Sequence, residues 1–114
     1  MERIDLATAL AALTETWSPR VVAQVNEVDI KLARLEGSFV WHHHEREDEL
    51  FLVVRGRLTM HLRDRDVELG EGQMLVVPRG VEHRPEASAE CCVLLVEPRS
   101  TLRLGNLDPG QPGD

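Results

Sequence analysis

The residues best suited to chemistry stand in one short run, Trp41-His-His-His-Glu-Arg-Glu-Asp-Glu49. On an extended strand, His42 and His44 would point to one side, with Cα atoms roughly 6.5 Å apart, and His43 would point to the other. Two imidazoles at that separation can bind one metal ion. Glu49 opens an apolar strand, where a carboxylate that faces the core is costly unless a positive partner holds it.

A fourth candidate ligand, His83, lies far along the chain, where a strand runs into a turn containing Pro78 and Gly80. Three histidines and one carboxylate suit a divalent transition metal ion, and an octahedral ion would keep two positions open for water, dioxygen or substrate. Ligand type leaves open whether the ion is Fe, Mn, Ni, Co or Zn. The two positive charges of a divalent ion exceed the single negative charge of Glu49. This excess favours anionic or chelating oxygen ligands at the open positions of the ion.

Short strands separated by turns are the elements that must position these side chains. The β-rich runs are Val21–Val25, Ile30–Leu35, Ser38–His44, Glu49–Val54, Arg57–Leu62, Val67–Leu69, Met74–Val77 and Cys91–Glu97. Turn signals separate them, including one at Pro85. Many short strands at even spacing indicate an all-β sandwich or barrel.

The two ends of the chain differ from this pattern. Good helix formers follow Asp5, a candidate N-cap, and Leu6, Leu10 and Leu13 form one apolar stripe, which predicts a short amphipathic helix. The last ten residues are punctuated by Pro and Gly without periodicity. We therefore expect a lead-in with a helix over residues 1–20, a barrel over 21–98 and an extended or disordered tail over 99–114.

The strand Glu49–Val54 is apolar on both faces. Phe51 and Val53 share a face with Glu49, while Leu50, Leu52 and Val54 occupy the other. The N-terminal helix or the sheet of a second subunit must cover that outer face, and we expect a homodimer.

Composition excludes several classes of protein. The chain has 114 residues and a formal charge of −7, which argues against a nucleic-acid or anionic-lipid partner. The run from Leu6 to Thr14 is the longest uncharged stretch near the N-terminus and is too short to span a bilayer. Its two cysteines, Cys91 and Cys92, are adjacent and can rarely form a disulfide, which favours a reducing compartment. We expect a cytoplasmic protein without a membrane partner.

These residues resemble the two motifs of the cupin superfamily. The first motif reads Gly, five residues, His-x-His, three or four residues, Glu, six residues, Gly, and it can be laid over Gly37 to Gly56. The resemblance implies a double-stranded β-helix, or jelly roll, in which His42, His44, Glu49 and His83 are the metal ligands. Asp48 is an alternative to Glu49, because the motif allows three or four residues after the second His. Glu49 is favoured because it shares a strand face with Phe51 and because six residues separate it from Gly56, as the motif requires.

The second motif matches at Gly72, Pro78, Gly80 and His83, and its terminal Asn is replaced by Ala87. In the first motif only four residues separate Gly37 from His42. Neither departure removes a ligand. The resemblance covers about residues 21 to 98 and is greatest for single-domain cupins likened to mannose-6-phosphate isomerase, which is a likeness of fold and not of reaction.

Three functions remain open from the sequence. The first is a metal-dependent oxygenase or isomerase acting on a small oxygenated substrate, with the metal at the centre of the reaction, because no Ser/His/Asp order, phosphate loop or inward Lys or Tyr stands out. The second is a non-catalytic module that binds or senses a metal or small molecule. The third is a partner subunit in which the metal only stabilises the fold. Vacant coordination positions and access from a pocket would separate the third from the other two.

Several other residues have structural interpretations. We expect His61 to be solvated or hydrogen-bonded, and Trp41 to point away from the metal as a packing or dimer residue. Phe51, Met60 and Met74 are expected to line or fill the barrel. One of the two cysteines should face in and the other out, as a small packed hydrophobe and an inert thiol.

Overall fold

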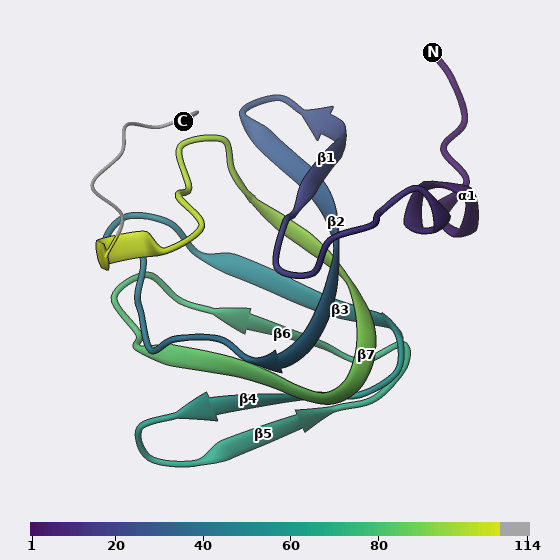
Figure 1. Cartoon of the computed structure of the whole chain (residues 1–114). Helices are drawn as coiled ribbons and strands as arrows, with labels where there is room; N and C mark the ends of the chain where they lie inside the picture. Colours follow the sequence, from purple (N-terminus) through teal and green to yellow (C-terminus); the bar gives the residue numbers. More distant parts are fainter. Residues whose placement is uncertain (108–114) are drawn as a thin grey trace.

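Antiparallel strands form the framework of the computed structural model, which describes residues 1–107 (Figure 1). The elements are α1 (Leu6–Ala11), β1 (Arg20–Val25), β2 (Val28–Ser38), β3 (Glu49–Arg55), β4 (Leu58–Leu62), β5 (Asp66–Leu69), β6 (Met74–Val77), β7 (His83–Pro98) and the 3-10 helix η1 (Gly105–Leu107). The expected all-β jelly-roll barrel with a short N-terminal helix is confirmed. Within residues 1–107, no helix is long and apolar enough to cross a membrane.

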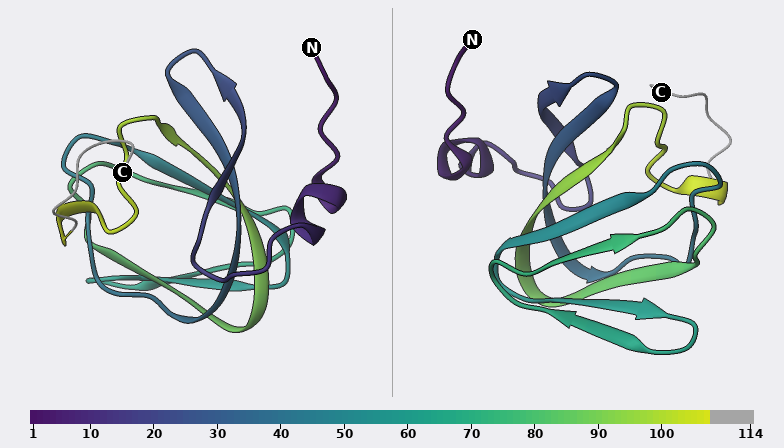
Figure 2. Two further views of the ribbon diagram at one scale, coloured as in Figure 1. Left: turned by 45° about the horizontal axis from the view of Figure 1, so that its top comes forward. Right: turned by 180° about the vertical axis from the view of Figure 1, so that it is seen from behind.

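The long strands β2 and β7 join the two layers of the barrel. One layer has the order β1-β2-β7-β3-β6, and the first part of β7 pairs with β4, which pairs with β5. Figure 2 shows the two layers closing around an interior. The register of β2 against β7 shifts between Leu35 and Gly37, and Gly37 has a φ of +85°. A glycine adopts this conformation easily, so the bend into the candidate metal loop forms despite the short spacing between Gly37 and His42.

Two sequence predictions about the strands are wrong. Residues 38–44 do not form a strand, because β2 ends at Ser38 and the next residues form a loop with a single bridge from His42 to His83. Pro85 is not a turn residue, because β7 already begins at His83 and passes through Pro85. The carbonyl of Pro85 accepts a hydrogen bond from Phe39 N, so this position contributes an acceptor to the sheet where proline has no N–H to donate.

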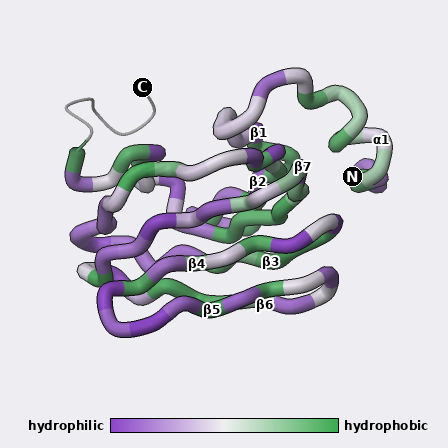
Figure 3. The backbone as a smooth tube through the Cα atoms, turned by 60° about the horizontal axis from the view of Figure 1, so that its bottom comes forward, coloured by the Kyte–Doolittle hydropathy of each residue, from purple (hydrophilic) through white to green (hydrophobic). Residues whose placement is uncertain are grey.

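Alternation along the strands places the core. In β3, Glu49, Phe51 and Val53 are buried while their neighbours are partly exposed, which confirms the predicted parity. Met60 is fully buried in the barrel, but Met74 is 58% exposed, so its expected place in the interior is wrong. Val77 pairs with Glu49 and is buried, and Met74 falls on the opposite face of β6. Figure 3 shows this mixing of hydrophobic and hydrophilic residues along the strands.

Helix α1 lies outside the barrel beside β2 (Figures 1 and 2). Asp5 caps it by accepting a hydrogen bond from Thr8 N at 3.0 Å, as the sequence predicts. Leu10 and Leu13 pack against Leu32 and Cys92 on the outer face of the sheet. The helix therefore covers part of that face.

The cysteines divide as expected from their alternation. Cys91 belongs to the core of the barrel and Cys92 to the cluster beneath α1, and both are fully buried and free. Burial, followed by the neighbouring Cys92 thiol, raises the pKa of Cys91 to about 11. The Cys91 thiol is therefore held in its unreactive protonated form.

Residues 99–107 differ from the expected extended tail. Thr101 is buried, and residues 105–107 form η1 at the same end of the barrel as the loop between β2 and β3 (Figure 1). The remainder of that expectation, residues 108–114, lies outside the described residues.

Gly56 shows why the turn after β3 needs glycine. Its φ is +88°, and a Cβ there would lie 2.8 Å from the backbone oxygen of Glu90. We expect Gly56→Ala to lower the free energy of unfolding by about 3 kcal/mol, because conformational strain adds to a clash with backbone. The matched variant Gly72→Ala has a similar φ but no atom within 4 Å, and should lose only about 1 kcal/mol. Urea unfolding of both variants measures the difference, and equal losses would show that the close approach contributes nothing.

Candidate metal centre

Four side chains from separate parts of the sequence converge inside the barrel. One donor atom from each of His42, His44, Glu49 and His83 lies within 4.8 Å of the others, and all four residues are buried. They come from the loop before β3, the first residue of β3 and the first residue of β7. The structure therefore brings together the four residues that the sequence singled out.

Backbone carbonyls orient two of the rings. His42 Nδ1 lies 3.0 Å from the Val40 carbonyl oxygen, and His83 Nδ1 lies 2.9 Å from that of Val81. When Nδ1 donates its hydrogen to a carbonyl, Nε2 keeps its lone pair and can bind a metal. A pair of backbone hydrogen bonds between His42 and His83 also holds the two residues side by side.

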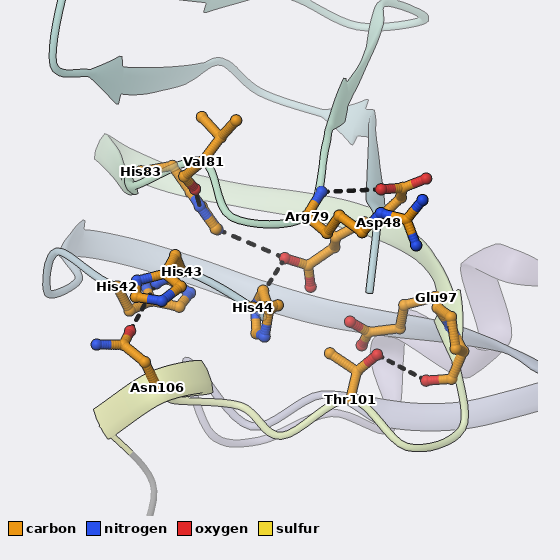
Figure 4. A network of polar contacts seen from close by, with 12 residues as sticks. His42, His43, His44, Asp48, Arg79, Val81, His83, Glu97, Thr101 and Asn106 are labelled. Atoms are coloured by element: carbon orange, nitrogen blue, oxygen red, sulfur yellow. Dashed lines mark hydrogen bonds and ion pairs between the residues drawn. The ribbon is translucent and has the colours of Figure 1, made fainter. Parts of the chain in front are cut away.

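The centre of the cluster contains buried polar atoms without hydrogen-bond partners. They include His44 Nε2, Glu49 Oε1 and His83 Nε2. Glu49 Oε1 lies 3.4 Å from His44 Nε2 and 3.6 Å from His83 Nε2, and dashed lines from the labelled rings of His44 and His83 mark these two contacts in Figure 4. Buried donors and acceptors without partners are costly, and one cation between them would satisfy them together. The donor set therefore fits a divalent transition metal.

The surroundings of His42 and Glu49 also shift their pKa values toward the protonation states that bind a metal ion. Burial, and then the proximity of His83, lower the pKa of His42 to about 4. Burial by itself would raise the pKa of Glu49, but the close approach of the His44 and His83 rings lowers this pKa below its usual range. At neutral pH His42 is uncharged and Glu49 is an anion, which are the protonation states in which imidazole and carboxylate bind metals.

The neighbouring polar residues point away from the cluster. Asp48, the alternative to Glu49, accepts a hydrogen bond from Arg79 N at 2.8 Å (Figure 4). His43 Nε2 lies 2.7 Å from Glu45 Oε1. Trp41 packs against the guanidinium of Arg63, whose central carbon lies 3.8 Å from the centroid of the Trp41 ring. Asp48, His43 and Trp41 therefore have contacts other than the cluster, as the sequence indicated for His43 and Trp41.

His61 is also outside the site. Its ring nitrogens lie 2.7 Å from Asp66 Oδ1 and 2.6 Å from Glu86 Oε1. Hydrogen bonds with Glu86 and then Asp66 raise its pKa. The hydrogen-bonded environment expected for His61 is confirmed.

The segment after β7 fixes the histidine loop, which sequence reasoning missed. Asn106 accepts a hydrogen bond from His43 N through Oδ1 and donates its own backbone N–H to His43 O, each at 2.8 Å. Figure 4 shows Asn106 against His43, which stands between the candidate ligands His42 and His44. No motif marks Asn106, because its partner is a backbone group distant in sequence.

A cavity of about 490 Å³ opens onto the cluster. His42 and Glu49 line it, whereas His44 and His83 are not among its lining residues. Its apolar wall includes Trp17 and Phe39, whose stacked rings have centroids 4.9 Å apart, and Phe39 meets His42 edge to face at 5.3 Å. A small molecule can therefore reach the cluster from one side.

The cavity also contains an ion pair that the sequence analysis did not anticipate. Lys31 Nζ lies 3.0 Å from Glu97 Oε1, and Glu97 is buried. Figure 4 shows the carboxyl of Glu97 on the same side of the cluster as His44. Strand parity could have found both residues, because Lys31 shares a strand face with Ala33, and Glu97 shares one with Leu95, along predicted strands. No inward lysine stood out in the sequence, and the structure places Lys31 among the residues that line the cavity.

Comparison with known proteins agrees with this geometry. A family model described as a cupin domain matches residues 30–97. The solved structure of a cupin-2 domain containing protein from Shewanella frigidimarina is 43% identical, with a TM-score of 0.83 over 84% of this chain and 94% of that one. The chain belongs to the cupin family.

Two curated proteins are also similar. The uncharacterised protein YdbB of Bacillus subtilis is 34% identical over 77 residues, which are 67% of this chain and 68% of that protein. The 3-hydroxyanthranilate 3,4-dioxygenase of Danio rerio is 32% identical over 62 residues. That match spans 51% of this chain but only 22% of the dioxygenase, so it concerns one part of that enzyme.

Proposed function

We propose that this cupin binds one divalent transition metal ion through His42, His44, Glu49 and His83 and acts on a small oxygenated substrate as an oxygenase or isomerase. The observation that carries the proposal is the group of buried, unpartnered donor atoms beside a cavity. A closed structural site would have no such access, whereas catalytic sites keep an open position. The similarity to a stretch of a dioxygenase supports the same class of chemistry.

Different residues of the chain have different roles in this proposal. When bound, the ion supplies a Lewis acid for an oxygen atom of the substrate or of dioxygen. His42 and Glu49, which line the cavity, would hold the ion together with His44 and His83, and Trp17 and Phe39 would exclude water along the apolar wall. Glu97, with Oε2 buried and unpartnered, is placed to hydrogen-bond a polar group that enters from the cavity.

The alternative is a non-catalytic module that binds or senses a metal or a small molecule. One observation favours it, because the half-buried Lys31 and the buried carboxyl of Glu97 already contact each other in the cavity. Such a pair can fix a ligand in place without moving a proton. Turnover distinguishes the two functions.

The test is metal content followed by turnover, on protein purified without an affinity tag or a chelator. We expect close to one Fe, Mn, Ni, Co or Zn ion per chain by elemental analysis. Oxygen consumption under air, compared with product formation under argon, then separates oxygenase from isomerase activity across a panel of small hydroxy and keto compounds. Metal without turnover would favour the alternative. Protein that holds no metal and gains no thermal stability from divalent ions would contradict the proposal.

We also propose that the protein is a homodimer in a reducing, cytoplasmic compartment. Apolar side chains of the outer sheet face are half exposed, with Met74 at 58% and Val76 at 50%, and α1 covers only a part of the face. Two free buried thiols are compatible with a reducing compartment. Light scattering on the untagged protein should give twice the mass of 12.9 kDa, and a monomer mass would contradict the dimer.

A further inference from the structure

Lys31 is the single lysine of a chain that has twelve arginines. It lies on β2 with its side chain among the residues that line the cavity, and only 16% of that side chain is exposed. Its one charged partner at ion-pair distance within residues 1–107 is Glu97. A lysine ammonium has three hydrogens to donate, so Lys31 retains donors for a further acceptor.

The charges around the cavity do not balance once a metal is bound. Its cations are Lys31, Arg99 and Arg103, and its carboxylates are Asp29, Glu49 and Glu97. Even with all three carboxyls ionised, these six side chains only offset one another, so at least the two positive charges of a divalent ion would remain. A cavity with this excess favours an anion.

Arg103 provides a second cation near the aromatic wall. Its Nη1 donates a hydrogen bond to the backbone oxygen of Trp17 at 3.1 Å. Among the described residues, no carboxylate lies within ion-pair distance of Arg103. Lys31 is thus the inner cation of the cavity and Arg103 is an exposed cation beside Trp17.

The apolar part of the cavity favours a flat ligand. Trp17 and Phe39 are nearly parallel, with an angle of 18° between their planes, and Phe51 contributes another aromatic ring to the lining. Because Phe39 also contacts His42, this wall extends up to the candidate metal ligands. A ring that lies along it would present one edge to the metal centre.

We propose that the substrate is a small carboxylic acid with a flat apolar body, and that Lys31 and Arg103 bind its carboxylate. This inference rests on the proposed function, because it names the class of molecule that the metal centre receives. Lys31 and Arg103 determine specificity in this site, while the aromatic wall contacts the body of the molecule. A neutral analogue of the same shape loses the interaction with both cations.

Benzoate is the simplest probe of this class, and benzamide is its neutral match. The chain has two tryptophans, so Trp41→Phe leaves Trp17, which lines the cavity, as the only one. In this background, quenching of Trp17 fluorescence reports binding in metal-loaded protein. We expect saturable quenching by benzoate at concentrations at least about tenfold lower than for benzamide, since a charge-assisted contact is lost.

Variants of the two cations complete the test. Lys31→Met should weaken benzoate binding at least about tenfold, and Lys31→Arg, which keeps the charge, should restore most of it. If Lys31→Met does not fold, the test rests on Arg103→Gln, because Arg103 is exposed. We expect this variant to bind benzoate several-fold more weakly than the parent. Arg57→Gln is the matched control, because Arg57 is 72% exposed and pairs with Glu68.

Metal content measured on the same samples separates this inference from the proposed function. Equal binding of benzoate and benzamide would overturn the inference, as would unchanged benzoate binding in both Lys31→Met and Arg103→Gln, with the metal retained. Absence of metal from the parent protein would overturn the proposed function and, with it, the statement that the acid is a substrate, but not the assignment of Lys31 and Arg103 as its binding residues. The preference for benzoate and its dependence on Lys31 would then still be measured in the metal-free cavity.

Discussion

Replacing His83 with alanine is expected to abolish metal retention. His83 is fully buried, it is hydrogen-bonded to the backbone of His42 on one side, and its Nε2 faces Glu49 without another partner. Because a direct ligand is lost, the fall in metal affinity should exceed the 10–100-fold typical of partners in the outer shell. Elemental analysis after dialysis, and competition with a chelator of known affinity, measure the change.

His43→Ala is the matched control for this variant. His43 is adjacent to two of the candidate ligands, but its Nε2 contacts Glu45 and not the cluster. We expect metal affinity to stay within a few-fold of the parent. If His43→Ala lost its metal as completely as His83→Ala, the set of ligands inferred from the sequence and the geometry would be wrong.

The candidate ligands could be predicted from sequence because local rules govern them. Alternation separates His42 and His44 from His43, and it puts Glu49 on the buried face of β3 with Phe51. These relations hold even though residues 38–44 form a loop and not the expected strand. The loop keeps the needed direction because the bridge to His83 and the Val40 carbonyl fix the ring of His42.

The remaining parts of the site depend on contacts between distant segments. Lys31 and Glu97 meet because β2 and β7 are neighbours, with Asp29 opposite Glu97 in the register. The position of Asn106 depends on how the chain folds back after β7. Parity gives the face of the sheet on which a residue lies, but the strand order that brings two faces together is a property of the whole chain. The same limit explains Pro85, which follows a turn-like pattern yet lies within a strand.

Glu97→Gln is expected to stabilise the metal-free protein at alkaline pH. Burial, followed by repulsion from Glu49, raises the pKa of Glu97, and the ion pair with Lys31 offsets only part of this. The folded state therefore holds a proton that the unfolded state releases above about pH 4.5. It follows that the free energy of unfolding falls as the pH rises from about 4.5 toward the raised pKa. Glutamine is neutral at every pH and removes this decline.

Urea unfolding at pH 5 and pH 8, after treatment with a chelator, measures this effect. Parent and Glu97→Gln should differ little at pH 5, and the variant should be more stable by at least about 1 kcal/mol at pH 8. Glu68→Gln is the control, because Glu68 is 63% exposed. This substitution should change the free energy of unfolding by the same amount at pH 5 and at pH 8. A variant that is less stable than the parent at pH 8 would contradict the prediction. Glu97 would then be an ionised partner that holds Lys31 in place, and the cavity would carry less excess positive charge to attract an acid.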